Sequence, residues 1–201
     1  EDLDFSLRWR RAGGRLQLAE SATELGVLAR LTGSREELVA SLVRQREELV
    51  RVANGYFETI ERNDGTIATR FWPHCNRVEN GVQTTNNADF PLPVARMGCE
   101  EQFALGWYRY DDDLRARRFP LVDIERGIVL AYGFIDHSGK LGEYRLTDGT
   151  TASSPVRRPH SYYLAEAFRI RDHAIEQVEA DFLTVPYRMP SPWDARPEAA
   201  A

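Results

Sequence analysis

The longest hydrophobic pattern in the chain predicts one long amphipathic helix. Ser34 and Glu37 form a capping box at its start, in which each side chain accepts a backbone N–H of the first turn. Asn63-Asp64-Gly65 ends the helix, because Asn and Gly readily adopt the left-handed backbone conformation that follows a helix. Between these signals the apolar residues recur at helical spacing and form one face: Leu38, Leu42, Leu49, Ala53, Tyr56 and Ile60.

The second half of the chain has the pattern of β-strands. Residues 117–136 predict two strands separated by a turn at residues 125–127. Residues 128–135 are apolar on both faces, so we expect a central strand that is covered on both sides. Residues 162–170 and 175–185 predict a closing hairpin. One helix followed by long strands indicates the α+β class.

Shorter segments complete the pattern. We expect the tail from residue 186 to be extended or ordered only by docking, because it holds four of the ten prolines. The other expected segments are a β-hairpin at residues 5–25, a short helix at 66–72 stopped by Pro73, a strand at 74–85, a loop at 86–98, a second amphipathic helix at 99–110 and a polar loop at 138–159.

Composition and charge narrow the class of protein. The chain has 201 residues, of which 42% are hydrophobic and 28% charged, the ordinary balance of a globular protein. A net charge of -5 argues against nonspecific binding to nucleic acid or to anionic membranes. No run of about 18 apolar residues could span a bilayer, and no signal peptide is visible, although the chain starts at Glu1. We therefore expect a cytoplasmic protein.

Several kinds of chemistry lack their sequence signals. The two cysteines, Cys75 and Cys99, are too few for a disulfide scaffold or a cysteine-rich zinc site. They could form one bridge, but in a cytosolic protein two buried thiols are the expected state. The four histidines lack metal-ligand spacing, and the chain has no Gly-rich phosphate loop, dinucleotide fingerprint or Gly-x-Ser-x-Gly elbow. We therefore expect neither a metal nor a cofactor.

Four segments carry a resemblance to a known superfamily: YFETIERNDG, CNRVENGVQTT, RRFPLVDIERGIVLAYGFIDH and AEAFRIRDHAIEQVEADF. Over about residues 35–193 the chain resembles the nuclear transport factor 2-like superfamily, in particular a SnoaL-like branch of bacterial and fungal proteins. The resemblance implies a cone-shaped, curved mixed β-sheet wrapped around a long N-terminal helix and shorter helices, enclosing a pocket. It also implies a homodimer or homotrimer formed through the open sheet face.

The same resemblance sets the expected domain organisation and leaves the reaction open. We expect a β-hairpin extension at residues 1–33, a pocket domain at 34–193 and a disordered tail at 194–201. Members of the superfamily include dehydratases, isomerases, cyclases, epoxide hydrolases, deformylating lyases and non-catalytic binding domains, so the fold does not decide the function.

Glu166 is the sharpest candidate for chemistry. In the strand at residues 162–170 it shares a face with Tyr162, Leu164 and Phe168, because side chains of a strand alternate between faces. A carboxylate among apolar neighbours is desolvated, which raises its pKa and suits it to general acid or base catalysis. The alternative is a structural carboxylate paired with a buried arginine.

Arg77 and Glu79 form a second candidate pair. They lie two residues apart and therefore point to the same side of their strand, opposite Val78. The resemblance implies that this strand lines the pocket, where Glu79 would be a second acid or base. Arg77 would then stabilise a developing oxyanion or hold Glu79 ionised. The alternative is a structural ion pair.

Two histidines are candidates for moving a proton near neutral pH. His137 follows Asp136 at the end of a strand, so only one of the two can face the pocket. His74 lies at the entry to the strand of Arg77, as a base at the pocket rim would, and dehydratases of the superfamily use a histidine base. The sequence places no aspartate partner for His74 at a diagnostic spacing. The alternative is that His137 is an exposed turn residue.

Aromatic side chains and one arginine are candidates for substrate binding. The hydroxyls of Tyr56, Tyr132 and Tyr162 could donate to a substrate oxygen, and Arg109 could face inward from the second helix. The alternatives are core packing for the tyrosines and a solvated side chain for Arg109.

These residues together indicate acid/base chemistry on a small molecule. The expected function is a cofactor-independent lyase, dehydratase or isomerase of an oxygenated, aromatic or polycyclic compound, including retro-aldol or deformylating cleavage. The alternative is a non-catalytic domain for ligand binding or assembly. A protonated Glu166 in an open pocket favours catalysis, whereas a Glu166 fully paired with arginine in a filled pocket excludes it.

Overall fold

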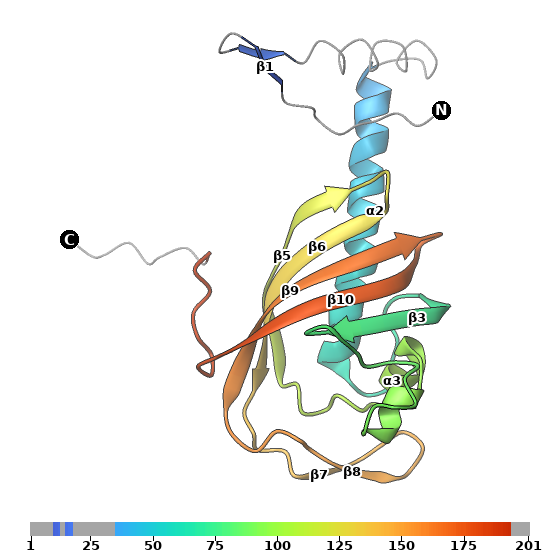
Figure 1. The fold of residues 1–201 in the computed structure, drawn as a ribbon, viewed down its shortest axis with the longest axis vertical. Coiled ribbons are helices and arrows are strands. Elements are labelled where there is room, and N and C mark those ends of the chain that lie inside the picture. The colour runs from blue at the N-terminus through green and yellow to red at the C-terminus, as the bar shows by residue number, and fades with distance from the viewer. Residues whose placement is uncertain (1–9, 13–14, 18–34, 194–201) are drawn as a thin grey trace, which may run out of the picture.

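A computed structural model describes residues 10–12, 15–17 and 35–193 of the chain. One long helix, α2 (Arg35–Arg62), lies against a curved six-stranded sheet, and its first turns rise beyond the strands (Figure 1). The strands are ordered β4-β3-β10-β9-β6-β5. Their bounds are β3 Phe71–Glu79, β4 Val82–Gln83, β5 Asp113–Asp123, β6 Ile128–His137, β9 His160–Arg171 and β10 Ala174–Val185. The predicted α+β fold is confirmed.

The sheet is mixed because one long crossover brings β3 beside β10. These two strands pair in parallel, whereas β9 pairs antiparallel with both β10 and β6. The turn between β5 and β6 requires glycine, since Gly127 has a φ of 63° and a Cβ there would lie 2.1 Å from the carbonyl oxygen of Ile170. The predicted turn at residues 125–127 and the closing hairpin are confirmed.

The core lies between α2 and the inner face of the sheet. The helix contributes residues at three- and four-residue spacing, and the strands contribute every second residue. Burial of this apolar face stabilises the pair of layers by about 25 cal/mol for each Å² removed from water. The most buried members are Val52, Ala53, Phe57, Val129, Ala131, Leu164, Phe168, Ile175 and Val178.

Smaller elements close the lower end of the sheet in Figure 1. They are the 3-10 helix η1 (Pro93–Arg96), the helix α3 (Cys99–Ala104) and the hairpin of β7 (Glu143–Arg145) with β8 (Thr151–Ser153). The predicted loop at residues 86–98 is thus a loop with one turn of 3-10 helix. The second helix is shorter than the predicted 99–110, because Gly106 at a φ of 70° ends it. The polar loop at residues 138–159 contains the β7–β8 hairpin, which its polar composition did not indicate.

The short helix expected at residues 66–72 is wrong. Residues 66–70 instead run along α2: Thr59 Oγ1 accepts the N–H of Ala68 at 2.9 Å, and Thr69 Oγ1 donates to a carbonyl of α2 at 3.0 Å. Gly55 permits this contact, since a Cβ there would lie 2.8 Å from the Cβ of Thr69. The chain therefore satisfies its polar groups against α2 rather than within a helix of its own.

Pro73 lies inside β3 and does not precede it. The pairing of β3 with β10 passes from Phe71 with Ile175 to Asn76 with Gln177, so Pro73 falls in the interruption of the ladder, where no N–H is needed. The strand expected at residues 74–85 is therefore two strands, β3 and β4, which pair antiparallel across a turn.

Cys75 and Cys99 form a disulfide, so the expectation of two buried thiols is wrong. The bond joins β3 to the first residue of α3 across a Cα–Cα distance of 5.7 Å. The two cysteines are 24 residues apart, and only the crossover from β3 through the 86–98 loop brings them together. The disulfide closes this loop on the sheet.

The described residues do not test the predicted domain boundaries. Strands β1 (Arg10–Ala12) and β2 (Arg15–Gln17) pair antiparallel, as the N-terminal hairpin predicted, while the rest of residues 5–25 and the tail at 194–201 lie outside the described residues. The boundaries at residues 33 and 193 stay predictions. No helix in the described part of the chain is long and apolar enough to cross a membrane.

Candidate functional site

A small cavity lies between the inner face of the sheet, α2 and the segment that leads from α3 to β5. Its volume is about 100 Å³. Its wall combines apolar side chains with polar ones, which come from α2, β3, β6, β9 and the segment before β5. The polar groups include Tyr56, Arg77, Glu79, Asp111, His137 and Glu166.

Arg77 is one of the largest fully buried side chains in the described residues, with 1% of its surface exposed. Its Nε lies 2.8 Å from Glu79 Oε1, and its Nη2 donates to Gln102 Oε1 at 2.6 Å and to the hydroxyl of Tyr108. Burial acts to lower the pKa of Arg77, but the charge of Glu79 and further neighbours raise it above its ordinary value. Arg77 is therefore a fixed cation in the wall of the cavity.

Glu166 is also buried, with 2% of its surface exposed, and it forms no ion pair with any described residue. It lies in β9 opposite Ala131 of β6, on the face that packs against α2. Burial is the main cause that raises its pKa to about 8, and the charge of Glu79 adds to it, while Arg77 and a hydrogen bond with Tyr56 act in the opposite direction. At neutral pH Glu166 is mostly a neutral acid.

His137 and Asp111 form a pair on the other side of the cavity. The Nε2 of His137 lies 2.9 Å from Asp111 Oδ1, and both side chains are almost fully buried. Burial raises the pKa of Asp111, and its hydrogen bond with His137 acts to lower it. We assign the Nε2–H proton to this hydrogen bond, which leaves a lone pair on Nδ1.

The second ring nitrogen of His137, Nδ1, is buried and has no hydrogen-bond partner among the described residues. The ring is held from two sides, since it stacks on His160 with 4.7 Å between centroids and meets the edge of Tyr162 at 5.0 Å. A histidine that is oriented by a carboxylate and carries a free lone pair has the arrangement of a general base.

The tyrosines of the cavity are neutral hydroxyls. Burial raises the pKa of Tyr56 and Tyr110 well above the ordinary value, and burial raises that of Tyr162 as well. Tyr56 lines the same cavity as Arg77 and Glu166, and each of them influences its pKa. Its neutral hydroxyl is therefore available as a hydrogen-bond donor in the cavity.

The structure brings together six of the nine site residues that the sequence predicts. These residues line one cavity, and they are Tyr56, Arg77, Glu79, His137, Tyr162 and Glu166. Side chains of β6 alternate between the two faces of the sheet. His137 therefore lies on the inner face and Asp136 on the outer face, where Arg115 binds it. His137 is not the exposed turn residue that the alternative expected.

The other three do not lie at the cavity, and these expectations are corrected. His74 is exposed, because Cys75 beside it faces inward and a strand alternates. Tyr132 lies on the outer face of β6, stacked on Tyr163 with 6.2 Å between centroids. Arg109 follows the end of α3, and its Nε lies close to Gly106 rather than in the cavity wall.

Sequence reasoning missed Asp111 and Gln102. Asp111 belongs to an acidic run that precedes β5. Asp113 pairs with Asp136, so residues 111 and 112 lie opposite the end of β6, but the register shifts twice between the β5–β6 turn and Asp113 and could not be counted from the turn. Gln102 lies on a helix face between apolar residues and gave no signal. Within the described ranges, no cluster of three or more His, Cys, Asp or Glu side chains is arranged to hold a metal ion.

Comparison with protein families assigns the chain to one family. The model of the family described as a domain of unknown function (DUF8021) matches residues 43–182, which is more than half of the chain. The chain therefore belongs to the DUF8021 family. No curated protein matches the chain significantly.

Solved structures show only distant likeness. AusH from Aspergillus nidulans is 12% identical with a TM-score of 0.43, over 69% of this chain and 85% of AusH. PrhC from Penicillium brasilianum NBRC 6234 is 12% identical with a TM-score of 0.43, over 69% of this chain and 82% of PrhC. LinA is 12% identical with a TM-score of 0.39, over 74% of this chain and 96% of LinA.

Likenesses at this level carry no argument about function. The architecture itself, a long helix against a curved mixed sheet, is the one that the nuclear transport factor 2-like resemblance implied. The SnoaL-like branch stays a prediction.

Proposed function

We propose that this member of the DUF8021 family is a lyase, dehydratase or isomerase that uses its cavity for acid/base catalysis on a small oxygenated molecule. One observation carries the proposal. The cavity wall holds both a buried carboxylic acid, Glu166, and a buried histidine base, His137, that is oriented by Asp111. A buried acid and a buried base that line one cavity are the minimum equipment for concerted proton transfer.

The geometry suggests a division of roles. His137 would take a proton through Nδ1 from a carbon next to a carbonyl group, and Asp111 would stabilise the imidazolium that forms. Arg77 and Tyr56 would stabilise the negative charge that develops on the carbonyl oxygen.

Glu166 would complete either of two reactions. In an elimination it protonates a hydroxyl on the neighbouring carbon; the C–O bond breaks, water leaves and a C=C bond forms. In an isomerisation it protonates the substrate at another position. The carboxylate of Glu166 then regains its proton from the imidazolium of His137, directly or through water, and the cycle closes without a net change in the protein.

The cavity size limits the substrate. About 100 Å³ lies well below the range of roughly 300–1,000 Å³ that encloses drug-sized ligands, and it is smaller than the cavity of about 150 Å³ that holds a benzene molecule. We therefore propose a compact oxygenated substrate in place of the aromatic or polycyclic one that we expected from the sequence. Glu79 already balances the charge of Arg77 within the protein. We therefore propose a neutral substrate rather than an anion.

Proton exchange tests this function without knowledge of the natural substrate. Hydroxyacetone and dihydroxyacetone in D₂O serve as probes, and ¹H NMR follows the loss of the C–H signal next to the carbonyl. The wild-type chain should accelerate this exchange, and His137→Gln should lose about 10²–10⁴-fold of the acceleration. His74→Gln is the matched control and should exchange both probes at the wild-type rate.

Exchange by the wild-type chain no faster than by His137→Gln contradicts the proposal. Saturable binding of a probe without any exchange would instead support a non-catalytic binding domain.

We also propose that the chain self-associates through the outer face of the sheet. Leu121 and Leu183 lie on this face with 51% and 63% of their surfaces exposed. Light scattering coupled to gel filtration should give the mass of a dimer or trimer, and a monomer would contradict it. The absence of a cofactor and the cytoplasmic location stay predictions.

A further inference from the structure

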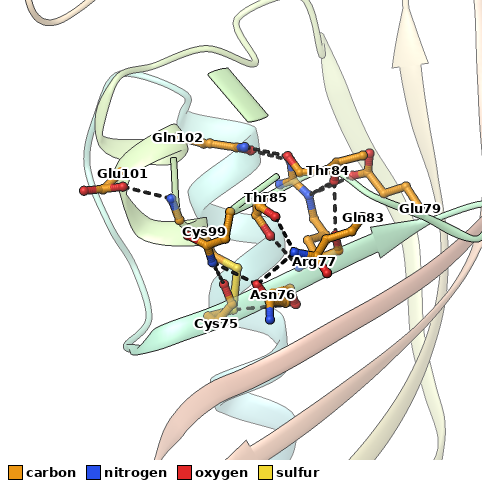
Figure 2. Close-up of a disulfide and its surroundings, with 12 residues drawn as sticks. Cys75, Asn76, Arg77, Glu79, Gln83, Thr84, Thr85, Cys99, Glu101 and Gln102 are labelled. Carbon is orange, nitrogen blue, oxygen red and sulfur yellow. Dashed lines mark hydrogen bonds and ion pairs between the residues drawn. A yellow bond between two sulfur atoms is a disulfide. The ribbon is translucent and has the colours of Figure 1, made fainter. Parts of the chain in front are cut away.

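Two cross-links join β3 to α3 one after the other. The first is the Cys75–Cys99 disulfide, and the second is the hydrogen bond from Arg77 Nη2 to Gln102 Oε1 at 2.6 Å (Figure 2). Cys75 and Arg77 lie two residues apart on a strand, so they share one face. Cys99 and Gln102 lie three residues apart on a helix, so they also share one face. The disulfide therefore joins the same face of β3 to the same face of α3 as the hydrogen bond does.

Gln102 has no exposed surface, and its side-chain amide is fully used. Its Oε1 accepts from Arg77 and from the hydroxyl of Tyr108, the latter at 2.5 Å. Its Nε2 donates to the carbonyls of Thr84 at 2.7 Å and Val94 at 3.0 Å. One side chain thus joins the cation of the cavity to the loop that follows β4 and to the 3-10 helix.

The helix that carries Gln102 is itself held in place. The carboxylate of Glu101 accepts the N–H of Gly98 at 2.8 Å, which fixes the first turn of α3. The side chain of Asn86 donates to the carbonyl of Cys75 at 3.1 Å, beside the disulfide. Rotation of α3 about its axis would strain the disulfide and break the hydrogen bonds of Gln102 with Arg77, Thr84 and Val94.

We propose that Gln102 is a positioning residue for Arg77, and that the Cys75–Cys99 disulfide holds Gln102 in the place where it does this. The inference rests on the proposed function, in which Arg77 stabilises negative charge in the cavity. Gln102 does not line the cavity and therefore does not touch a substrate there. It acts through the guanidinium, whose Nε is held by Glu79 and whose Nη2 is held by Gln102 and Tyr108.

The arrangement explains why a glutamine occupies this position. An apolar side chain would leave the Nη2 of Arg77 with the hydroxyl of Tyr108 alone. It would also remove the side-chain donor of the Thr84 carbonyl and leave the Val94 carbonyl with the N–H of Met97. A carboxylate would bind Arg77 as an ion pair but could not donate to the carbonyls of Thr84 and Val94. An amide accepts from the cation through its oxygen and donates to both carbonyls through its two N–H groups.

The test compares Gln102→Met with the wild-type full chain by two measurements. The first is the ¹⁵N chemical shift of the Arg77 Nε–H, and the second is the pKa of Glu166 from ¹³C NMR of labelled glutamate. Because Arg77 acts to lower the pKa of Glu166, its release should raise that pKa by about one unit, and the Arg77 signal should broaden or shift. Gln83→Met is the matched control, because Gln83 lies on β4 and bonds to Thr85 and Asn76 rather than to Arg77.

A second variant tests the disulfide. It also keeps the inference testable if Gln102→Met does not fold. In Cys75→Ala with Cys99→Ala both measurements should move in the same direction as in Gln102→Met, by a smaller amount. A folded Gln102→Met, or a folded double cysteine variant, in which Arg77 and Glu166 keep their wild-type signals overturns the inference.

Both measurements are independent of catalysis, so they separate this inference from the proposed function. Wild-type chain that exchanges neither probe refutes the proposed function and leaves the Arg77 and Glu166 signals to decide the role of Gln102. Where exchange is present, Gln102→Met should reduce its rate by about tenfold or more and shift its pH profile with the pKa of Glu166.

Discussion

The two faces of the sheet bury carboxylates in opposite ways. On the outer face, Asp136 accepts two hydrogen bonds from Arg115, at 2.7 and 3.1 Å, and one from Ser161. Burial acts to raise the pKa of Asp136, but these donors and the nearby charge of Arg188 outweigh it, so the pKa lies below its ordinary value. On the inner face, Glu166 has no ion pair among the described residues, and its pKa rises to about 8.

The difference shows that burial alone does not decide the state of an acid. Asp136 is fully compensated, so it is ionised and structural. Glu166 is left uncompensated, so it keeps its proton at neutral pH, at a cost to stability that a purely structural residue would not need to carry. Two neighbours on β6 separate the roles, since Asp136 faces the outer cluster and its neighbour His137 faces the cavity.

The largest effect is expected on the outer face. Asp136→Ala leaves Arg115 without its carboxylate and Ser161 without its acceptor, and should lower the free energy of unfolding by about 3 kcal/mol. Urea denaturation followed by circular dichroism measures the change. Asp113→Ala is the control, because its ion pair with Arg188 at 3.6 Å is exposed and should contribute less than about 1 kcal/mol. Equal losses in the two variants would show that the outer cluster is no more than a surface ion pair.

An intermediate effect is expected on the inner face, and its sign depends on pH. The folded-state pKa of Glu166 is raised from 4.5 to about 8, so the stabilisation by its proton is complete below the unfolded value and is lost as the pH rises through about 8. From about pH 6 to about pH 9, the wild-type free energy of unfolding should fall by about 2–3 kcal/mol more than that of Glu166→Gln, which cannot ionise. Parallel pH profiles for the two proteins would contradict the uncompensated state of Glu166.

The smallest effect is expected at an exposed carboxylate. Bonds from Arg51, and to a lesser extent from His173, lower the pKa of Glu48 to about 2 although burial opposes them. Its side chain remains 33% exposed, and solvent screens the pair, so Glu48→Gln should change the free energy of unfolding by less than about 1 kcal/mol. A loss comparable to that of Asp136→Ala would mean that the pKa shift, rather than burial with full compensation, decides stability.

The sequence predicted the inner face where one face of a strand was clearly marked. Alternation on β9 placed Glu166 among apolar neighbours, and alternation on β3 sent Arg77 and Glu79 to the same side. The prediction for Tyr132 was wrong. Because β6 is apolar on both faces, alternation along it does not indicate which face packs against α2. The choice needs the pairing of Ala131 with Glu166, which is a property of the folded sheet.

Contacts between distant segments set the remaining limits. Asp111 meets His137 only because β5 pairs with β6 through a register that shifts twice, once beside Ala116 at a φ of 53°. The bond between Cys75 and Cys99 depends on the path of the 86–98 loop, which no periodicity describes. Local patterns therefore located Glu166 and Arg77. The pairing of His137 with Asp111 and the disulfide could be seen only in the tertiary structure.

The pKa of Glu166 in the wild-type chain tests the central claim most directly. A ¹³C NMR titration of glutamate-labelled protein, with Glu166→Gln to assign the signal, should show one carboxyl group that loses its proton at about pH 8. A Glu166 signal that titrates near the ordinary value of 4.5 would mean that the carboxylate is compensated like Asp136. The inner face would then be a second structural cluster rather than an acid/base site.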